Sequence, residues 1–372
     1  MAWEWWLVLI LSTLLFAIVM IMWHRMWVVS HRATLRPALA VPVPVPHSQP
    51  LAGQQIAVII NPSKSGATAF MEQFRTACFE ANLPAPKFYE TTIEDTGTGQ
   101  ALTALAEGAD LIIAAGGDGT VRSVAKSMVH TGVPMAIMPL GTGNLLARNL
   151  DFPVNSLDKL IAIAISGHLA RIDVGWVQIT QEGEDEPSDA HPSTWDPHLF
   201  TVITGVGFDA ALVQDTEDKL KRRIGWLAYF MAAARNLYYG RVRGSVTIDE
   251  FAPSIIEARS IMIGNCGRLP GGVTLLPNAK LDDGRLDLAA VDTKAGITGW
   301  VGLFGTVMLQ GAGIHTANYP KTGEIHFAQA EHVRVQLARA AHAQVDGDSI
   351  GMASILDAWV DRGALLIRVP AA

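Results

Sequence analysis

One glycine-rich turn with a single carboxylate, Gly116-Gly117-Asp118-Gly119-Thr120, carries the most specific chemistry in this sequence. Glycines let backbone N–H groups approach a phosphate closely, and the start of a helix adds positive potential at the same place. A carboxylate at such an anion site is costly unless a metal ion or a hydroxyl group requires it. Asp118 therefore points to chemistry on a magnesium-bound nucleotide rather than to simple anion binding.

The residues around this turn predict the elements that position it. Residues 111–115 form a short apolar run typical of a buried strand, and apolar residues recur at helical spacing over 121–129. Two similar units are strand 56–60 with Asn61-Pro62-Ser63-Lys64-Ser65-Gly66, and strand 135–139 with Gly141-Thr142-Gly143-Asn144. Three such units predict a parallel sheet with one ligand-binding edge. The alternative is that these glycines only end the strands.

The second half of the chain has a different texture. Short β-branched runs follow one another after residue 172, for example at 199–203 and, as the last, at 364–369, and they predict a mostly antiparallel β domain. The expected fold is an α/β nucleotide-binding domain with a parallel sheet at 54–170, followed by a β-rich substrate domain at 171–372 that completes the active site. The acidic segment 181–196 has no apolar periodicity and is interpreted as a solvated loop or a disordered insertion.

The N-terminus predicts a membrane anchor. Residues 5–23 contain only two polar side chains, Ser12 and Thr13, and a helix of this length would span about 28 Å of a hydrocarbon core of about 30 Å. Arginines follow this segment, which places the rest of the chain in the cytoplasm. We therefore expect a transmembrane anchor at 1–30, a proline-rich linker at 31–53, and a single-pass cell-membrane protein with a cytoplasmic catalytic domain. A cleaved signal peptide ending near Ala38-Leu39-Ala40 is the alternative.

Charge and cysteine content argue against several classes of protein. The net charge of -7 is unsuited to binding nucleic acid, and two cysteines are too few for a disulfide framework. The spacing of a Walker A loop and the third glycine of a dinucleotide fingerprint are both missing. The basic cluster at 219–223 precedes an aromatic segment, and it could either rest on an anionic membrane or form the charged first turn of a core helix.

The chain carries a set of short motifs in a defined order along the sequence. That set comprises Asn61-Pro62 with Ser65-Gly66, Gly116 to Thr120, Gly141-Thr142-Gly143-Asn144 with Ala147-Arg148, Gly205-Val206-Gly207-Phe208-Asp209-Ala210, Asn265 with Gly271-Gly272, Pro277, Ala279, Asp282-Asp283-Gly284 and Asp346-Gly347-Asp348. Taken in this order, the motifs resemble those of the diacylglycerol kinase catalytic-domain family of lipid kinases, which shares its fold with NAD kinases and includes sphingosine kinases. The glycine turn alone is shared with NAD kinases, whereas the ordered set is specific to lipid kinases.

The resemblance implies an ATP-dependent lipid kinase with ATP and Mg²⁺ as cofactors. The first substrate to consider is diacylglycerol, which would be converted to phosphatidic acid. The alternatives are a kinase of sphingoid bases or other lipids, an NAD kinase-like enzyme, and a non-catalytic protein that binds nucleotide or lipid. The expected partners are a membrane lipid as substrate and the bilayer through the N-terminal helix; a homodimer is left open, and nucleic acid is not expected.

The resemblance also implies roles for individual residues. The catalytic residues are Asp348, as the general base, and Asp118, near the metal-bound nucleotide. Similar proteins have a glutamate at the position of Asp348, which is one methylene longer. Because Asp118 sits in a turn, its replacement is expected to leave the fold nearly intact. The implied ATP contacts are Asn61, Thr92, Gly116, Gly117, Asp118, Gly119, Thr120, Val121, Arg122 and Thr142.

A structural Mg²⁺ site is implied at Asp283, with the backbone carbonyls of Lys280 and Arg285 as further ligands. The alternative there is a simple Asp-Gly turn between strands. The chain departs from many relatives at Arg122-Ser123, where they have Asn-Glu. Arg122 could add a phosphate contact or face the solvent.

Overall fold

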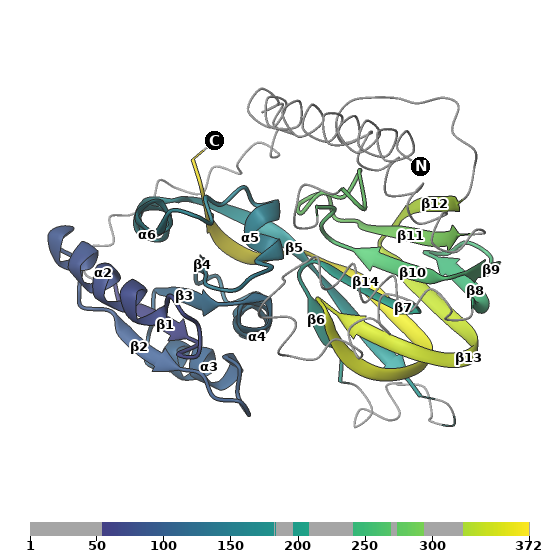
Figure 1. Cartoon of the computed structure of the whole chain (residues 1–372), viewed down its shortest axis with the longest axis horizontal. Coiled ribbons are helices and arrows are strands. Elements are labelled where there is room, and N and C mark those ends of the chain that lie inside the picture. The colour runs from purple at the N-terminus through teal and green to yellow at the C-terminus, as the bar shows by residue number, and fades with distance from the viewer. Residues whose placement is uncertain are drawn as a thin grey trace, which may run out of the picture.

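The computed structural model describes residues 54–181, 183, 196–207, 241–268, 274–293 and 323–371 (Figure 1). Within these ranges an α/β N-terminal part is followed by a mostly β C-terminal part, which confirms the expected two-domain architecture. Nearly all of the acidic segment 181–196 and the whole basic cluster 219–223 lie outside the described residues, as do the motif residues Phe208-Asp209-Ala210 and Gly271-Gly272.

The N-terminal part is a parallel sheet flanked by helices. Its strands are β1 (Ile56–Ile60), β2 (Lys87–Glu90), β3 (Leu111–Gly116) and β4 (Met135–Pro139), in the spatial order β4-β3-β1-β2 with every pair parallel. Its helices are α2 (Ala67–Glu80), α3 (Thr98–Ala106), α4 (Asp118–Met128), α5 (Leu145–Asn149) and α6 (Leu157–Ser166). Every residue of β1, β3 and β4 is buried, as expected for central parallel strands.

Helix α4 shows how the sequence fixes these helices on the sheet. Val121, Val124, Ala125 and Met128 are buried and recur at a spacing of three and four residues, so they form one face of the helix. That face packs against β3 and β4. Because α4 begins directly after β3, this packing also fixes the orientation of the glycine-rich turn between them.

The C-terminal part is built from strands that pair antiparallel with one another. A second hydrophobic core, which includes Phe200, Val333 and Leu356, lies between these strands. The strands are β5 (His168–Thr180), β6 (His198–Phe200), β7 (Ile203–Gly207), β8 (Val242–Ile248), β9 (Ser254–Ala258), β10 (Ser260–Gly264), β11 (Leu286–Thr293), β12 (Gly323–Ala330), β13 (His332–Val345) and β14 (Asp348–Val369).

The last strand connects the two parts. β14 has 22 residues, pairs antiparallel with β13 and β5, and then runs parallel to β4 through the pair Ile367 and Met135. The strands of the described residues therefore join in one continuous 14-stranded sheet. β14 begins at Asp348, and its far end pairs with β4. This one strand therefore connects the turn that carries Asp348 to the parallel nucleotide-binding sheet. The expected domain boundary at residue 170 falls inside β5.

The described helices contradict one expectation, the single-pass localisation at the cell membrane with a cytoplasmic catalytic domain. A helix needs about 20 mostly apolar residues to cross a bilayer. The longest described helix, α2, has 14 residues and is amphipathic, and none of the helices in the described ranges is long and apolar enough to span a membrane. The segments behind the expectation, the anchor at 1–30 and the linker at 31–53, lie outside the described residues.

Candidate active site

Two glycine-containing turns meet at the carboxyl ends of β3 and β4. A Cβ atom at Gly141 would lie only 2.6 Å from the Cα atom of Gly117, so the turns are in direct backbone contact. Asn144 adopts a left-handed conformation with φ of 48°. Its Oδ1 accepts a hydrogen bond from the N–H of Gly141 at 3.0 Å, and its Nδ2 donates to the carbonyl of Gly141 at 2.7 Å. The second turn is therefore held in one shape.

The carboxylate of Asp118 connects these turns. Its Oδ2 accepts the N–H of Asn144 at 2.9 Å, and its Oδ1 accepts the N–H of Leu145 at 2.6 Å, so it caps the start of α5. Burial raises the pKa of Asp118, and the nearby carboxylate of Asp346 raises it further, whereas the two N–H groups act in the opposite direction. Asp118 is thus part of the packing between the turns, which does not support the expectation that its replacement leaves the fold intact.

The turn between β13 and β14 is fixed by Asp346, which is buried and has a positive φ of 48°. Its Oδ1 accepts the N–H groups of Val202 and Ile203, both at 2.9 Å, and its Oδ2 accepts the N–H and the hydroxyl of Thr201 at 2.9 and 3.1 Å. Four hydrogen bonds thus tie this turn to the connection between β6 and β7. Asp346 therefore has a turn-forming role.

Asp348 follows this turn, and its side chain reaches the glycine-rich turn of the other part of the molecule. A Cβ atom built at Gly119 would lie 3.7 Å from Oδ2 of Asp348. The Asp348 side chain is 57% exposed, so its carboxylate faces solvent in the space beside the start of α4. The structure therefore places Asp348 beside Gly119, the residue after Asp118 in the turn, whereas the carboxylate of Asp118 itself is bound to the N–H groups of Asn144 and Leu145.

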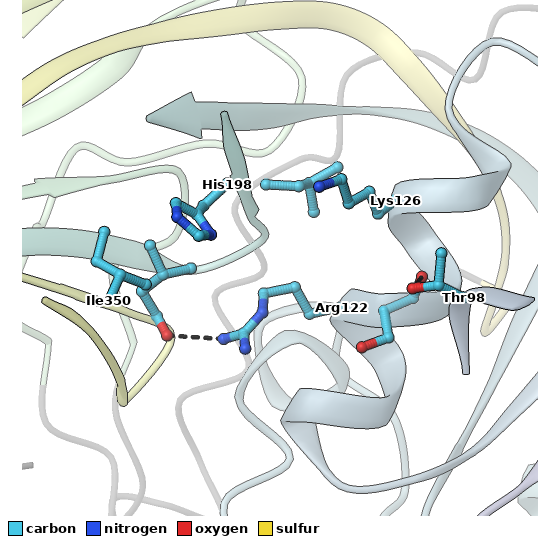
Figure 2. Close-up of a pocket in the computed structure, with 8 residues that line it drawn as sticks. Thr98, Arg122, Lys126, His198 and Ile350 are labelled. Carbon is cyan, nitrogen blue, oxygen red and sulfur yellow. Dashed lines mark hydrogen bonds between the residues drawn. The ribbon is translucent and has the colours of Figure 1, made fainter. Parts of the chain in front are cut away.

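Arg122 holds Asp348 in this position. Its Nη2 lies 2.6 Å from Oδ2 of Asp348, and its Nη1 donates a hydrogen bond to the carbonyl of Val345 at 2.7 Å (Figure 2). The two paired residues are 226 positions apart in the sequence. The side chain of Arg122 is only 20% exposed. Arg122 thus joins α4 to the β13–β14 turn, instead of facing the solvent.

The remaining candidate nucleotide contacts lie along the same edge of the parallel sheet. Asn61 directly follows β1, and its Oδ1 accepts the N–H and the hydroxyl of Ser63 at 3.0 and 2.7 Å. Thr92 follows β2 and accepts the N–H of Asp95 at 3.0 Å, and Thr142 is exposed in the turn after β4. Thr120 and Val121 are buried, so only their backbone atoms can face a ligand.

Lys64 is a basic residue of this edge that sequence reasoning did not assign. Its Cε and Nζ atoms would lie 3.7 and 3.8 Å from a Cβ atom at Gly117, so its ammonium group lies beside the glycine-rich turn. The only signal for it in the sequence is its place in the turn after β1, since that turn shares an edge with the turn after β3. An ammonium group there adds positive charge where phosphates would bind.

The candidate Mg²⁺ site at Asp283 is compatible with a hard cation. Burial raises the pKa of Asp283, and the carboxylates of Asp173 and Asp282 raise it further, whereas the N–H of Arg285 and the charge of Lys280 lower it. Its Oδ1 accepts the N–H of Arg285 at 3.1 Å. No group of three or more His, Cys, Asp and Glu side chains suited to a metal is present in the described residues. A bound Mg²⁺ would therefore need the backbone carbonyls of Lys280 and Arg285 together with water, which suits this ion.

A side chain at position 119 should block nucleotide binding without unfolding the protein. The Cβ position at Gly119 meets only Asp348, at an ordinary contact distance of 3.7 Å. We therefore expect Gly119→Val to keep its melting temperature within a few degrees, but to lose measurable binding of a non-hydrolysable ATP analogue by calorimetry, because the branched side chain fills the approach to the backbone N–H groups.

Gly141→Ala is the matched control for this experiment. Its methyl group would lie 2.6 Å from Gly117 Cα and 2.9 Å from Asn144 Oδ1, so this variant should lose stability as well as binding. Unchanged analogue affinity in Gly119→Val would show that the nucleotide does not approach this turn.

Comparison with known proteins assigns this architecture to a class of enzymes. The description "Diacylglycerol kinase catalytic domain" matches residues 55–177, and "YegS C-terminal NAD kinase beta sandwich-like domain" matches residues 201–367. Together the two matches cover most of the described residues of both parts. The chain belongs to the diacylglycerol kinase catalytic-domain family, and it is a lipid kinase.

Several relatives are similar over most of their length. The chain is 26% identical to the diacylglycerol kinase of Bacillus subtilis over 306 residues, which span 79% of this chain and 90% of the relative. It is 27% identical to the diacylglycerol kinase of Mycobacterium tuberculosis over 248 residues, which span 66% and 72%. It is 28% identical to a protein named "Probable lipid kinase YegS-like" from Pseudomonas aeruginosa over 272 residues, which span 72% and 79%.

The fold is shared with a solved structure. A crystal structure of a diacylglycerol kinase from Bacillus anthracis has a TM-score of 0.59 and 19% identity, and the match covers 85% of this chain and 97% of that one. This likeness supports the fold described above, in which a parallel α/β sheet is continued by a β-rich domain.

Proposed function

We propose that this lipid kinase transfers the γ-phosphoryl group of ATP to the free hydroxyl of diacylglycerol and so forms phosphatidic acid. The observation that supports the proposal is the position of Asp348, whose Oδ2 lies 3.7 Å from the Cβ position of Gly119. A carboxylate at this place can accept a proton from an alcohol while the adjacent glycine-rich turn holds phosphates. Phosphoryl transfer to an alcohol requires this combination.

In the proposed reaction, the backbone N–H groups of Gly117 to Gly119 and the start of α4 bind the phosphates, with Lys64 supplying a nearby positive charge. Asp348 accepts the proton of the lipid hydroxyl as its oxygen attacks the γ-phosphorus. The bond between the γ-phosphorus and the β,γ-bridging oxygen breaks, and ADP leaves. A bound Mg²⁺ would offset the charge of the phosphates, and Asp283 with the Lys280 and Arg285 carbonyls would hold a structural ion.

Arg122 and Asp118 have positioning roles in this proposal. The 2.6 Å ion pair with Arg122 keeps the partly exposed carboxylate of Asp348 beside the start of α4. Asp118 holds the two turns together through the N–H groups of Asn144 and Leu145. The remaining contacts proposed for ATP, at Asn61, Thr92 and Thr142, follow β1, β2 and β4 along one sheet edge.

An assay with radiolabelled ATP across a panel of acceptors tests the proposal. The panel contains diacylglycerol, monoacylglycerol, sphingosine and a glycolipid in mixed micelles, and NAD in solution. We expect Mg²⁺-dependent labelling of diacylglycerol with the largest kcat/KM, and its loss in Asp348→Asn. Preferred labelling of another lipid would replace the substrate, whereas labelling of NAD alone would contradict the lipid acceptor. Binding of ATP with no labelled product would favour a non-catalytic binding protein.

A further inference from the structure

A pocket next to the candidate active site combines basic, hydroxyl and apolar groups from both parts of the molecule. Figure 2 shows the side chains of Arg122 and Lys126, from α4, and of His198, from β6, converging on it. The pocket lies further along α4 than the glycine-rich turn. Its other lining residues are Thr98, Ser123, Leu199, Val345 and Ile350.

The basic groups of this pocket are incompletely neutralised. Arg122 and Lys126 are one helical turn apart on α4, where like charges repel each other. Arg122 is paired with Asp348, but the only carboxylate near Lys126 in the described residues is that of Asp196, at 3.9 Å and 84% exposed. Such an exposed pair contributes little. Nζ of Lys126 also donates to the carbonyl of Pro197 at 3.4 Å, which carries no full charge.

His198 is a half-buried imidazole that lies within the electrostatic reach of these cations. Burial lowers the pKa of His198, and the cations Lys126 and Arg122 lower it further, whereas Asp196 raises it. The carboxylate of Asp348, which lies beside the Arg122 end of the pocket, is paired with Arg122. An anion between these groups would reduce their mutual repulsion and would favour the charged imidazolium.

We propose that this pocket binds the phosphate group of a phosphate ester, at a site separate from the phosphates of ATP. Lys126 and His198 would bind the anionic oxygens, Arg122 would share its guanidinium between the anion and Asp348, and Ser123 offers a hydroxyl. Leu199, Val345 and Ile350 form the apolar wall that would face the carbon part of the ester. Because Arg122 also positions Asp348, an anion bound here acts on the candidate base, and the site goes beyond the proposed transfer of phosphate to diacylglycerol.

The experiment follows His198 by NMR in the full chain, with its ring C–H resonance assigned by its loss in His198→Gln. Saturating non-hydrolysable ATP analogue and Mg²⁺ are present throughout, so that the nucleotide site is filled. Inorganic phosphate is titrated first, followed by phosphatidylcholine vesicles with or without phosphatidic acid. We expect phosphate, or vesicles with phosphatidic acid, to raise the pKa of His198, and plain vesicles to leave it unchanged.

Lys126→Met tests whether the anion binds in this pocket or responds only to the net charge of the protein. Without an anion, the pKa of His198 should be higher in this variant than in the wild type, because a repelling cation is gone. The affinity for the anion should fall by roughly ten- to a hundredfold, the loss expected for a charge-assisted hydrogen bond. The matched control is Lys87→Met, which removes another exposed lysine, paired at 3.1 Å with Glu107 on a different edge of the molecule. It should leave both readings unchanged.

The comparison of inorganic phosphate with phosphatidic acid vesicles shows whether the pocket recognises a phosphate group alone or a lipid headgroup. A response to inorganic phosphate shows that the phosphate group alone is recognised, and a response only to phosphatidic acid vesicles shows that the lipid headgroup is required; both support the site. The proposal fails if neither source moves the His198 resonance while the ATP analogue fills the nucleotide site, or if Lys87→Met weakens the response as much as Lys126→Met does. Binding of the ATP analogue, measured separately, reports on the proposed kinase function alone.

Discussion

Replacing Asp348 by asparagine should lower turnover by about 10²- to 10⁴-fold with little change in ATP affinity, because a positioned general base contributes on that scale. The amide keeps the size of the side chain but cannot accept the proton of the lipid hydroxyl. The side chain of Asp348 is 57% exposed, and the amide oxygen of asparagine can still accept a hydrogen bond from Arg122, so stability should change by less than about 1 kcal/mol. Steady-state kinetics with ATP and diacylglycerol, together with calorimetric ATP binding, measure both quantities.

Two variants serve as controls for this result. Asp348→Glu should retain or raise activity, because it restores the longer side chain of similar proteins. Asp346→Asn should instead destabilise the protein, since an amide nitrogen would face N–H groups that the carboxylate now accepts from Thr201, Val202 and Ile203. Near-normal turnover in Asp348→Asn would rule out Asp348 as the base, and the proton would then have to leave through Asp118 or water.

Replacing Asp118 by alanine should abolish phosphoryl transfer and also destabilise the fold by about 1 to 3 kcal/mol. The loss of stability follows from the N–H groups of Asn144 and Leu145, which would be left without their acceptor at the start of α5. Urea unfolding gives the change in free energy, and the ATP assay gives the change in turnover. An Asp118→Ala variant with normal turnover would exclude the glycine-rich turn as the nucleotide site.

The pH dependence of stability provides an independent check on Asp118. Burial raises its pKa in the folded state, so the folded protein binds a proton more readily than the unfolded chain does. Stability from this group is therefore greatest when it is protonated, and it is lost as the pH rises through the raised pKa. Relative to Asp118→Asn, the wild type should gain stability as the pH falls through that raised pKa toward the ordinary pKa of the unfolded carboxyl. The opposite slope would show that the carboxylate is not buried as described.

Local sequence features were sufficient for the nucleotide-binding half. The bounds of β1 and β4 match the apolar runs 56–60 and 135–139, because strands buried on both faces are read directly from consecutive apolar residues. By contrast, β2 (Lys87–Glu90) was missed. It lies at the edge of the sheet and its first and last residues are exposed, so no apolar run marks it. Helix α3 was also missed, since it buries only two small residues, Ala101 and Ala104.

In the second half, tertiary contacts changed what the sequence predicts. The run 199–203 reads as one strand, but the structure has β6 ending at Phe200 and β7 starting at Ile203. The carboxylate of Asp346 accepts the N–H groups of Thr201, Val202 and Ile203. These N–H groups therefore do not donate to a neighbouring strand, and the run is divided into two strands. The responsible residue is more than 140 positions away, and no local pattern reveals it.

The sequence by itself predicted the chemistry of the site, because the glycines and carboxylates of the glycine-rich turn and of the Asp346-Gly347-Asp348 turn are local features. Their residue types alone indicate where the backbone can approach a phosphate and where negative charge lies. The sequence also determined the order of these motifs and the lipid kinase family they belong to. Only the tertiary structure decided that Asp348 meets Gly119, that Arg122 pairs with Asp348, and that the carboxylate of Asp118 accepts the N–H of Leu145 at the start of α5. The physical reason is β14, which starts at Asp348 and pairs with β4 at its far end, so contacts across some 226 residues depend on a strand pairing that no local pattern encodes.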